Sequence, residues 1–360
     1  MISLNKNKSE NESDKKMKSK ILMGLLIFIF VKINKAFCFP ELVRHGYNNC
    51  IACHVSPSGG GLLTQYGRGL SNEVLSSWGS EKEAQFLNGV IDTSSVSEWI
   101  QFGGDIRAVQ IHKEDAYIKK GRFIPMEASF SIGLVREQWA AVSKFGNFEN
   151  RIWKPYSDTY YIMYKPREEL SFRAGKFTPQ YGLTISDHIA FIKSFLDLGL
   201  QSSRNTIEAQ WTDEKITANI SHSEKSLAGF KEQSNQTQIQ YFFADKYKIA
   251  ANYMSRKDNF SQKNIWGFWS ILGFTQNLFW VNEFDWIKQT EKNTTVSYNK
   301  LGYTITKGLD LLLLSETLTP NKSTRAGLGF QYYPRPHIEL SGAWTKQEGD
   351  YAWLLFHYYM

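Results

Sequence analysis

The stretch "PHIELSGAWT", residues 336–345, places apolar side chains at every second position. One side of a strand with this period would carry Ile338, Leu340, Gly342 and Trp344. A repeat of two is the period of a β-strand with one apolar and one polar face. The same alternation recurs in residues 100–108 and 325–332. These segments together predict an all-β fold.

About sixteen strands are predicted when the whole chain is read for this alternation. They span residues 99–112, 122–135, 138–147, 157–165, 169–177, 204–212, 215–223, 234–243, 247–256, 264–274, 277–288, 294–305, 309–317, 323–333, 336–346 and 350–359. Every second connection is tight, such as "TDEK" and "TKG". The others tend to be longer and polar, including "SHSEKSLAGFKEQSNQ", "SRKDNFSQKN" and the segment 178–204. Alternating short and long connections around an even number of strands are typical of a transmembrane antiparallel β-barrel, with tight turns and both termini in the periplasm.

Strand length separates this barrel from the alternative, an exported β-sandwich or propeller. Several predicted strands reach ten to twelve residues, which suits a tilted bilayer crossing of roughly 9–11 residues. The last ten residues, "YAWLLFHYYM", alternate to the end of the chain. They resemble the terminal strand signal of outer-membrane barrel proteins, although they end in Met rather than Phe or Trp. The expected location is the bacterial outer membrane.

The N-terminus has the features of an export signal. Residues 21–31, "ILMGLLIFIFV", form an apolar run after the lysine-rich "KKMKSK". This apolar run is too short for a helix that spans a membrane. We expect residues 1–38 to be a signal peptide, with Met17 as an alternative start, residues 39–98 a haem-binding segment and residues 99–360 the barrel. Eight of the 42 Lys and Arg residues and three of the 35 Asp and Glu residues precede Phe39, so the rest carries a net charge of only +2. This balance gives no reason to expect a nucleic-acid partner.

Cys50, Cys53 and His54 form the pattern C-x-x-C-H. It resembles the attachment motif of c-type cytochromes, and this resemblance covers the motif only. It implies one covalent haem c, held by thioether bonds from Cys50 and Cys53, with His54 as the proximal iron ligand. A disulfide or a thioredoxin-like redox pair would not need His54, and a zinc site would need a fourth ligand.

The surroundings of the motif are less specific. Gly59, Gly60 and Gly61 would let the backbone approach a porphyrin edge or turn sharply, or they form an ordinary flexible loop. Residues 62–90 have helix-like apolar spacing in patches, so the segment is expected to be partly helical. His45 is the candidate for the distal haem ligand because it is the histidine nearest to His54 in the sequence.

The connection 178–204 carries apolar residues that do not suit an extracellular loop. We expect Ile189, Phe191, Ile192, Phe195, Leu196 and Leu198 to fold it inward against the barrel wall as a constriction. With the preceding strand, "RAGKFTPQYGL" at residues 173–183, it is similar to phosphate-selective porins. This similarity is not specific enough to imply that this chain has an anion as its substrate. Arg107, Arg173 and Arg325 are candidate lumen charges or ordinary members of a wet interior.

Two functions follow from this architecture. The first is electron transfer at or across the outer membrane, with periplasmic or extracellular cytochromes as partners, because a single haem does not span a membrane. The second is a porin for small solutes or anions in which the haem segment is a structural plug or sensor. A third class is a soluble exported binding protein. It applies only if the chain does not form a barrel. No catalytic constellation is recognisable, so an enzyme is not expected.

Overall fold

The computed structural model describes residues 40–90, 96–117, 119–148, 156–185, 187, 189–199, 202–227, 230–289, 292–319 and 323–360. All of them belong to one compact unit, Ala36–Met360. The expected signal peptide, residues 1–38, lies outside the described residues. Within the described part, no helix has the length and apolarity needed to cross a membrane.

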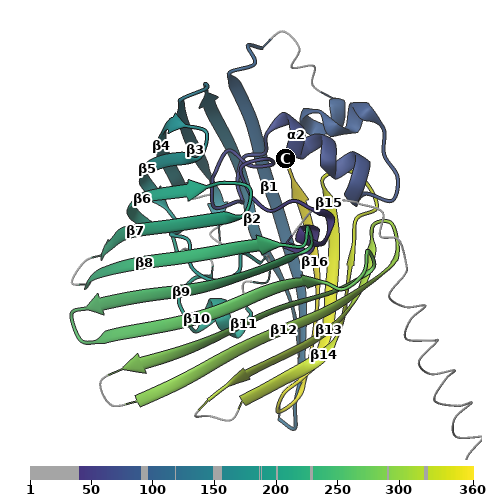
Figure 1. Cartoon of the computed structure of the whole chain (residues 1–360). Helices are drawn as coiled ribbons and strands as arrows, with labels where there is room; N and C mark the ends of the chain where they lie inside the picture. Colours follow the sequence, from purple (N-terminus) through teal and green to yellow (C-terminus); the bar gives the residue numbers. More distant parts are fainter. Residues whose placement is uncertain are drawn as a thin grey trace, which may run out of the picture. The chain divides into compact units, whose positions relative to one another are not determined.

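Sixteen antiparallel strands close into a barrel, as the alternation predicted (Figure 1). They are β1 Ile100–Glu114, β2 Lys119–Val135, β3 Trp139–Phe148, β4 Tyr156–Arg167, β5 Leu170–Phe177, β6 Arg204–Thr212, β7 Ile216–Leu227, β8 Phe230–Phe243, β9 Tyr247–Asp258, β10 Gln262–Gly273, β11 Leu278–Gln289, β12 Lys292–Thr306, β13 Leu309–Leu318, β14 Ser323–Tyr332, β15 Ile338–Lys346 and β16 Asp350–Tyr359. Each strand pairs with its sequence neighbours. β1 pairs with β16 from Asp105↔Tyr359 to Glu114↔Asp350, which closes the barrel.

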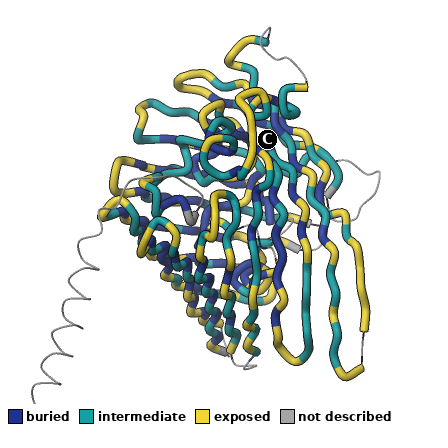
Figure 2. Tube along the Cα trace, turned by 90° about the vertical axis from the view of Figure 1, so that its right-hand side faces the viewer, coloured by how far each residue is buried: buried dark blue, intermediate teal, exposed yellow. Residues whose placement is uncertain are grey.

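The two faces of the strands are reversed relative to a soluble protein. In β15, the side chain of Trp344 is exposed on the outside, whereas Glu339, Ser341 and Thr345 are buried inside. Leu328 of β14 and Ile106 of β1 are exposed in the same way. Figure 2 shows exposed and buried residues alternating along the strands. An apolar outer surface around a polar interior is the arrangement of a transmembrane barrel.

Two connections predicted as long loops are instead parts of strands. β7 and β8 continue through the polar stretch 221–236 until Leu227 pairs with Phe230. β9 and β10 likewise extend to Asp258 and from Gln262. The prediction was wrong here because polar alternation without an apolar face was taken for loop. Hydroxyl and amide side chains can line both faces of a hairpin that extends beyond the apolar outer surface of the barrel. Between β7 and β8, the hydroxyl groups of Ser223 and Ser234 are hydrogen-bonded at 2.9 Å.

The N-terminal segment lies at the end of the barrel where the tight turns are, next to the C-terminus (Figure 1). It contains only short helical turns, as expected for a partly helical segment. They are η1 Pro40–His45, α2 Gln65–Leu70, η2 Ser71–Leu75, η3 Glu81–Ala84 and η4 Phe86–Gly89. The remaining helix, α3 Phe191–Ser194, belongs to the connection between β5 and β6.

Candidate haem site and barrel interior

The C-x-x-C-H motif forms a single turn. The amide nitrogens of Cys53 and His54 donate to the carbonyl of Cys50 at 3.2 and 2.9 Å, and the Ala52 amide donates to Asn49 Oδ1 at 3.3 Å. This turn places Cys50, Cys53 and His54 within one hydrogen-bonded turn of the backbone. The chain then returns antiparallel to itself, and the Thr64 amide donates to the carbonyl of Cys53 at 2.9 Å.

Three consecutive glycines make this return possible. Gly59, Gly60 and Gly61 have φ values of 80°, 71° and 63°, in the left-handed region that other residues rarely adopt. A Cβ atom on Gly59 would lie 3.2 Å from Cys50 Sγ. At Gly60 and Gly61 no atom lies within 4 Å of the Cβ position. The glycines therefore turn the backbone and leave open space beside the motif.

The chemical state of the motif suits the attachment of haem c. Cys50 and Cys53 are not joined in a disulfide. Burial lowers the pKa of His54 to about 4, so its imidazole is neutral, which is the form that binds a metal ion. The buried Nδ1 of His54 has no hydrogen-bond partner among the described residues. Two cysteines outside any disulfide, a neutral imidazole and the open space at Gly60 and Gly61 fit a covalently attached haem.

A zinc site receives no support from the described residues. No three side chains of His, Cys, Asp or Glu come together there in a group that could hold a metal ion. The motif supplies two thiols and one imidazole and lacks the fourth ligand of a structural zinc site.

His45, the candidate distal ligand, lies at the end of η1, which packs against β9, β10 and β11. Its Nε2 accepts a hydrogen bond from Arg44 Nε at 2.8 Å, and its buried Nδ1 has no partner among the described residues. Burial, with a smaller effect of the charge on Arg44, lowers the pKa of His45 to about 3. His45 is thus a neutral, partly buried imidazole, but it is not on the turn that carries His54. Its role as distal ligand stays a prediction.

Arg173 of β5 fastens the loop that follows the motif. Its guanidinium donates to Ser56 Oγ at 2.8 Å and Ser58 Oγ at 2.9 Å. It also pairs with Glu208 at 2.7 Å and lies 3.8 Å from the centre of the Phe177 ring. Arg173 is therefore not a lumen charge open to solutes but a buried anchor for the N-terminal segment.

Leu62 is the apolar anchor of the same loop. Its side chain occupies a notch on the inner wall made by two glycines, because a Cβ atom on Gly103 or Gly133 would lie 2.8 or 2.4 Å from a methyl group of Leu62. Leu62 and Val55 belong to a buried cluster with residues of β3 to β5, namely Ala140, Val142, Tyr161, Met163 and Phe177. Sequence reasoning missed this notch. A glycine at an inward strand position is the signal that could have revealed it.

The rest of the segment is tied to the turns of the barrel. The Ser77 amide donates to the carbonyl of Tyr333 at 2.8 Å, and the Trp78 amide to that of Pro334 at 3.2 Å. At the C-terminal strand, Tyr358 Oη donates to Asn88 Oδ1 at 2.6 Å. Together with Arg173 and Leu62, these contacts reach different parts of the wall, so the segment lies across the tight-turn mouth.

The connection between β5 and β6, called here the inward loop (residues 178–203), folds into the barrel as its apolar residues predicted. Ile192 and Leu196 are only 1% and 2% exposed, and they join a large cluster with inward residues of β9 to β13. Ile189 and Phe195, which were expected in the same contact, are instead exposed at 37% and 45%. The α3 turn directs residues three and four apart to one face, so not every apolar residue of the loop can reach the wall.

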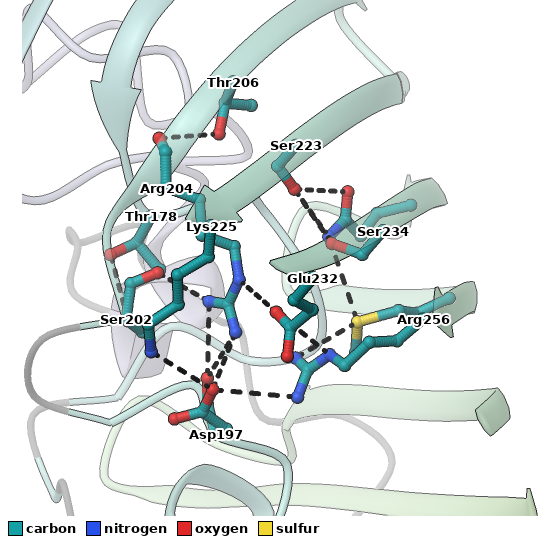
Figure 3. A network of polar contacts seen from close by, with 12 residues as sticks. Thr178, Asp197, Ser202, Arg204, Thr206, Ser223, Lys225, Glu232, Ser234 and Arg256 are labelled. Carbon is teal, nitrogen blue, oxygen red and sulfur yellow. Dashed lines mark hydrogen bonds and ion pairs between the residues drawn. The ribbon is translucent and has the colours of Figure 1, made fainter. Parts of the chain in front are cut away.

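Ion pairs hold the inward loop at its other end (Figure 3). Asp197 is 2.8 Å from Arg204 Nη2, 3.7 Å from Lys225 Nζ and 3.9 Å from Arg256 Nη1. Arg204 is fully buried and also pairs with Glu232 at 2.8 Å. We call these five residues the Asp197 latch. Sequence reasoning missed it because its members come from the inward loop and four different strands.

The other candidate lumen charges are paired inside the barrel. Arg107 lies 3.6 Å from Asp105 and 3.7 Å from Glu127. Arg325 Nε donates to Glu316 at 2.9 Å. Both arginines therefore have acidic partners, and neither provides an isolated positive charge for an anion.

Comparison with known proteins supports the fold. No protein-family model matches the chain, and no curated protein sequence does. Among solved structures, it is similar to a loop-deletion mutant of OmpT, an outer membrane protein of Vibrio cholerae, with a TM-score of 0.59 and 11% identity over 72% of this chain and 99% of that one. A mutant of the porin of Rh. blastica gives 0.54 and 11%, over 72% and 100% of the two chains. The outer membrane channel DcaP of Acinetobacter baumannii gives 0.54 and 9%, over 72% and 97%. At these identities the similarity concerns the fold alone.

Proposed function

We propose that the protein is an outer-membrane barrel that carries one covalent haem c in its tight-turn mouth and takes part in electron transfer at or across that membrane. The observation that carries the proposal is the turn that presents Cys50, Cys53 and His54 inside the mouth of a barrel with an apolar outer surface. When bound, haem c supplies one-electron redox chemistry. The names of the similar structures agree with an outer-membrane location.

The residues around the motif have defined parts in this proposal. Cys50 and Cys53 form the thioether bonds, and the neutral imidazole of His54 binds the iron. Arg173 and Leu62 hold the motif against the wall, which limits access of water to the site and keeps its surroundings fixed. The tight-turn mouth faces the periplasm, where haem is attached to such motifs, and a periplasmic or extracellular cytochrome completes the electron path.

The alternative function, a porin for small solutes or anions with the haem segment as plug or sensor, also has an observation in its favour. The inward loop narrows the barrel from within, and two of the similar structures are called a porin and a channel. The paired state of Arg107, Arg173 and Arg325 gives no support to an anion in particular.

Haem staining of the full-length chain tests the first proposal. After expression with a c-type maturation system, the outer-membrane fraction should contain a haem-stained band on denaturing gels, and the Cys50→Ser, Cys53→Ser double variant should lose it. A wild-type band without haem would refute the proposal. Single-channel recording then separates the two functions, because a porin must conduct, whereas an electron carrier does not need an open channel.

A further inference from the structure

Neutral polar side chains line the inner wall of β6 to β9. Four carboxamides from these four consecutive strands stand in one row, since Gln210 pairs with Asn219, Asn219 with Gln238, and Gln238 with Asn252. We call these four residues the carboxamide row. Because directly paired residues of neighbouring strands point to the same face, all four amides project into the barrel interior.

The amides of the row are buried without enough hydrogen bonds. All four side chains are at most 5% exposed. Both amide atoms of Asn219, Gln238 and Asn252, and Oε1 of Gln210, have no hydrogen-bond partner among the described residues. Exchanging the oxygen and nitrogen of an amide does not remedy this where both atoms are unpaired. Buried polar groups in folded proteins are nearly always hydrogen-bonded, so seven atoms in one row call for a ligand.

Gln236 shows that the wall is able to satisfy an amide. It lies two residues from Gln238 on the same face of β8 and is equally buried. Its amide is hydrogen-bonded to the hydroxyl groups of Ser221, Ser223 and Ser234 at 3.0, 3.2 and 2.8 Å. The lack of partners is thus a property of the row and not of the whole interior.

At its two ends the row meets protein groups. Gln210 Nε2 donates to the carbonyl of Pro57, in the N-terminal segment, at 3.1 Å. Beyond Asn252 the register continues through Gly267 to Asp285, where Tyr181 of the inward loop donates to Asp285 at 2.8 Å. A Cβ atom on Gly267 would lie 2.9 Å from Asn252 Nδ2 and 2.7 Å from Tyr181 Oη. The N-terminal segment therefore supplies a partner to Gln210 at one end of the row, the inward loop pairs with Asp285 beyond the other end, and both amide atoms of Asn219, Gln238 and Asn252 have none among the described residues.

We propose that the carboxamide row binds a neutral, extended solute with several hydroxyl groups, such as a short sugar chain. A carboxamide both donates and accepts, as does a hydroxyl group, so the two chemistries match along the row. The strand spacing of about 4.8 Å gives the four amides a length of about 14 Å, which requires an extended solute. An ion is not favoured, because the nearby charges pair with each other, Arg173 with Glu208 and Arg204 with Glu232.

The inference rests on the alternative function proposed above, the porin for small solutes, and names the class of solute. Because the row is shielded from bulk solvent, the solute displaces the covering contacts of the segment or the inward loop when it binds. Binding is therefore measured directly and not inferred from flux.

The test is a calorimetric titration of the purified, detergent-solubilised full chain with maltotriose, and with citrate as a charged comparison. Gln238→Met removes an unpaired amide of the row, and Gln236→Met is the matched control on the same strand. We expect the wild type and Gln236→Met to bind maltotriose and not citrate, and Gln238→Met to bind about tenfold more weakly, the loss of one or two hydrogen bonds. If Gln238→Met does not fold, Asn252→Leu takes its place.

Two outcomes would overturn the inference. One is that the wild type does not bind maltotriose. This result would mean that only water molecules form hydrogen bonds with the amides of the row. The other is a Gln238→Met variant that binds as well as the wild type. Haem staining of the same samples keeps the two proposals apart. Haem without sugar binding contradicts only the carboxamide row, and sugar binding without haem contradicts only the electron-transfer proposal.

Discussion

At the scale of single residues, Arg173 connects the N-terminal segment to the wall. Its side chain joins Ser56 and Ser58 of the segment to Glu208 of β6. Removing one partner of a buried ion pair leaves the other charge buried and unpaired. The position of the motif in the mouth thus depends on a residue that lies more than a hundred positions further along the chain.

Changing Arg173 to Gln should loosen the N-terminal segment. The expected cost is about 3 kcal/mol, because Glu208 remains buried without its partner. Limited proteolysis of the membrane-embedded protein should cut within residues 50–60 faster than in the wild type. Arg325→Gln is the matched control, since Arg325 also pairs with a glutamate inside the barrel. Equal cleavage of both variants would contradict the anchoring role of Arg173.

His337 makes the docking of the segment sensitive to acid. It is fully buried in the turn before β15, and its amide donates to Ser71 Oγ at 2.8 Å. Burial, with a smaller effect of the charge on Arg68, lowers the pKa of His337 to about 4. The unfolded chain takes up this proton near pH 6.5 and the folded one only near pH 4. The stabilisation is therefore complete above pH 6.5 and is lost as the pH falls toward 4.

A comparison of melting at two pH values measures this effect. Between pH 7.5 and pH 5 the wild type should lose about 2 kcal/mol that His337→Asn does not lose. Asparagine is a suitable replacement because position 337 has a φ of 65°, which asparagine tolerates. The same pH dependence in both proteins would show that other groups cause the acid sensitivity.

At the scale of elements, the inward loop is held by two kinds of contact. Its apolar residues pack against β9 to β13, and the Asp197 latch ties it to β6, β7, β8 and β9. The side chain of Asp197 is half exposed, so solvent weakens its ion pairs. Arg204 keeps Glu232 as a partner when Asp197 is changed. The latch is thus the weaker of the two contacts and the one that a single substitution can release.

Asp197→Asn should shift the inward loop toward an open position. A loss of about 1 kcal/mol raises the open fraction about fivefold. Single-channel recording in planar bilayers should show more frequent or longer openings than in the wild type. Asp245→Asn, in a tight turn at the other end of β9, should leave the record unchanged. An unchanged record for Asp197→Asn would mean that the apolar contacts alone fix the loop.

At the scale of the whole molecule, the two ends of the barrel differ. One end carries the tight turns, the C-terminus and the N-terminal segment, and the other carries the tips of the long hairpins, such as the one between Leu227 and Phe230. In outer-membrane barrels the tight turns face the periplasm. By this rule we predict that the N-terminal segment faces the periplasm.

Epitope tags test this orientation. A tag between Leu227 and Phe230 should be labelled by antibody on intact cells, whereas a tag beside Asp245 should be labelled only after the outer membrane is opened. The untagged protein should fractionate with the outer membrane and migrate differently on gels with and without heating. Surface labelling of the Asp245 tag would reverse the orientation and place the motif outside the cell.

Local sequence patterns were enough to predict the strands and their number, and residue spacing alone identified the C-x-x-C-H pattern, whose haem stays a prediction. A strand is a local structure with a period of two, so residues such as Ile338, Leu340 and Trp344 reveal it without knowledge of the rest of the chain. The spacing of Cys50, Cys53 and His54 is equally local, and the apolar composition of the inward loop predicted its direction. The ends of β7 to β10 were missed because their polar residues do not show which backbone groups are paired.

The contents of the barrel could not be predicted from local patterns and became known only from the folded structure. The notch for Leu62 needs Gly103 and Gly133 on neighbouring strands, the anchor at Arg173 needs β5 next to the motif, and the carboxamide row exists only in the register of four strand pairs. These contacts join residues that are distant in sequence, and a shift of one residue in a single strand would turn its side chains to the other face. Local periodicity carries no information about such registers, because they are set by closure of the whole barrel.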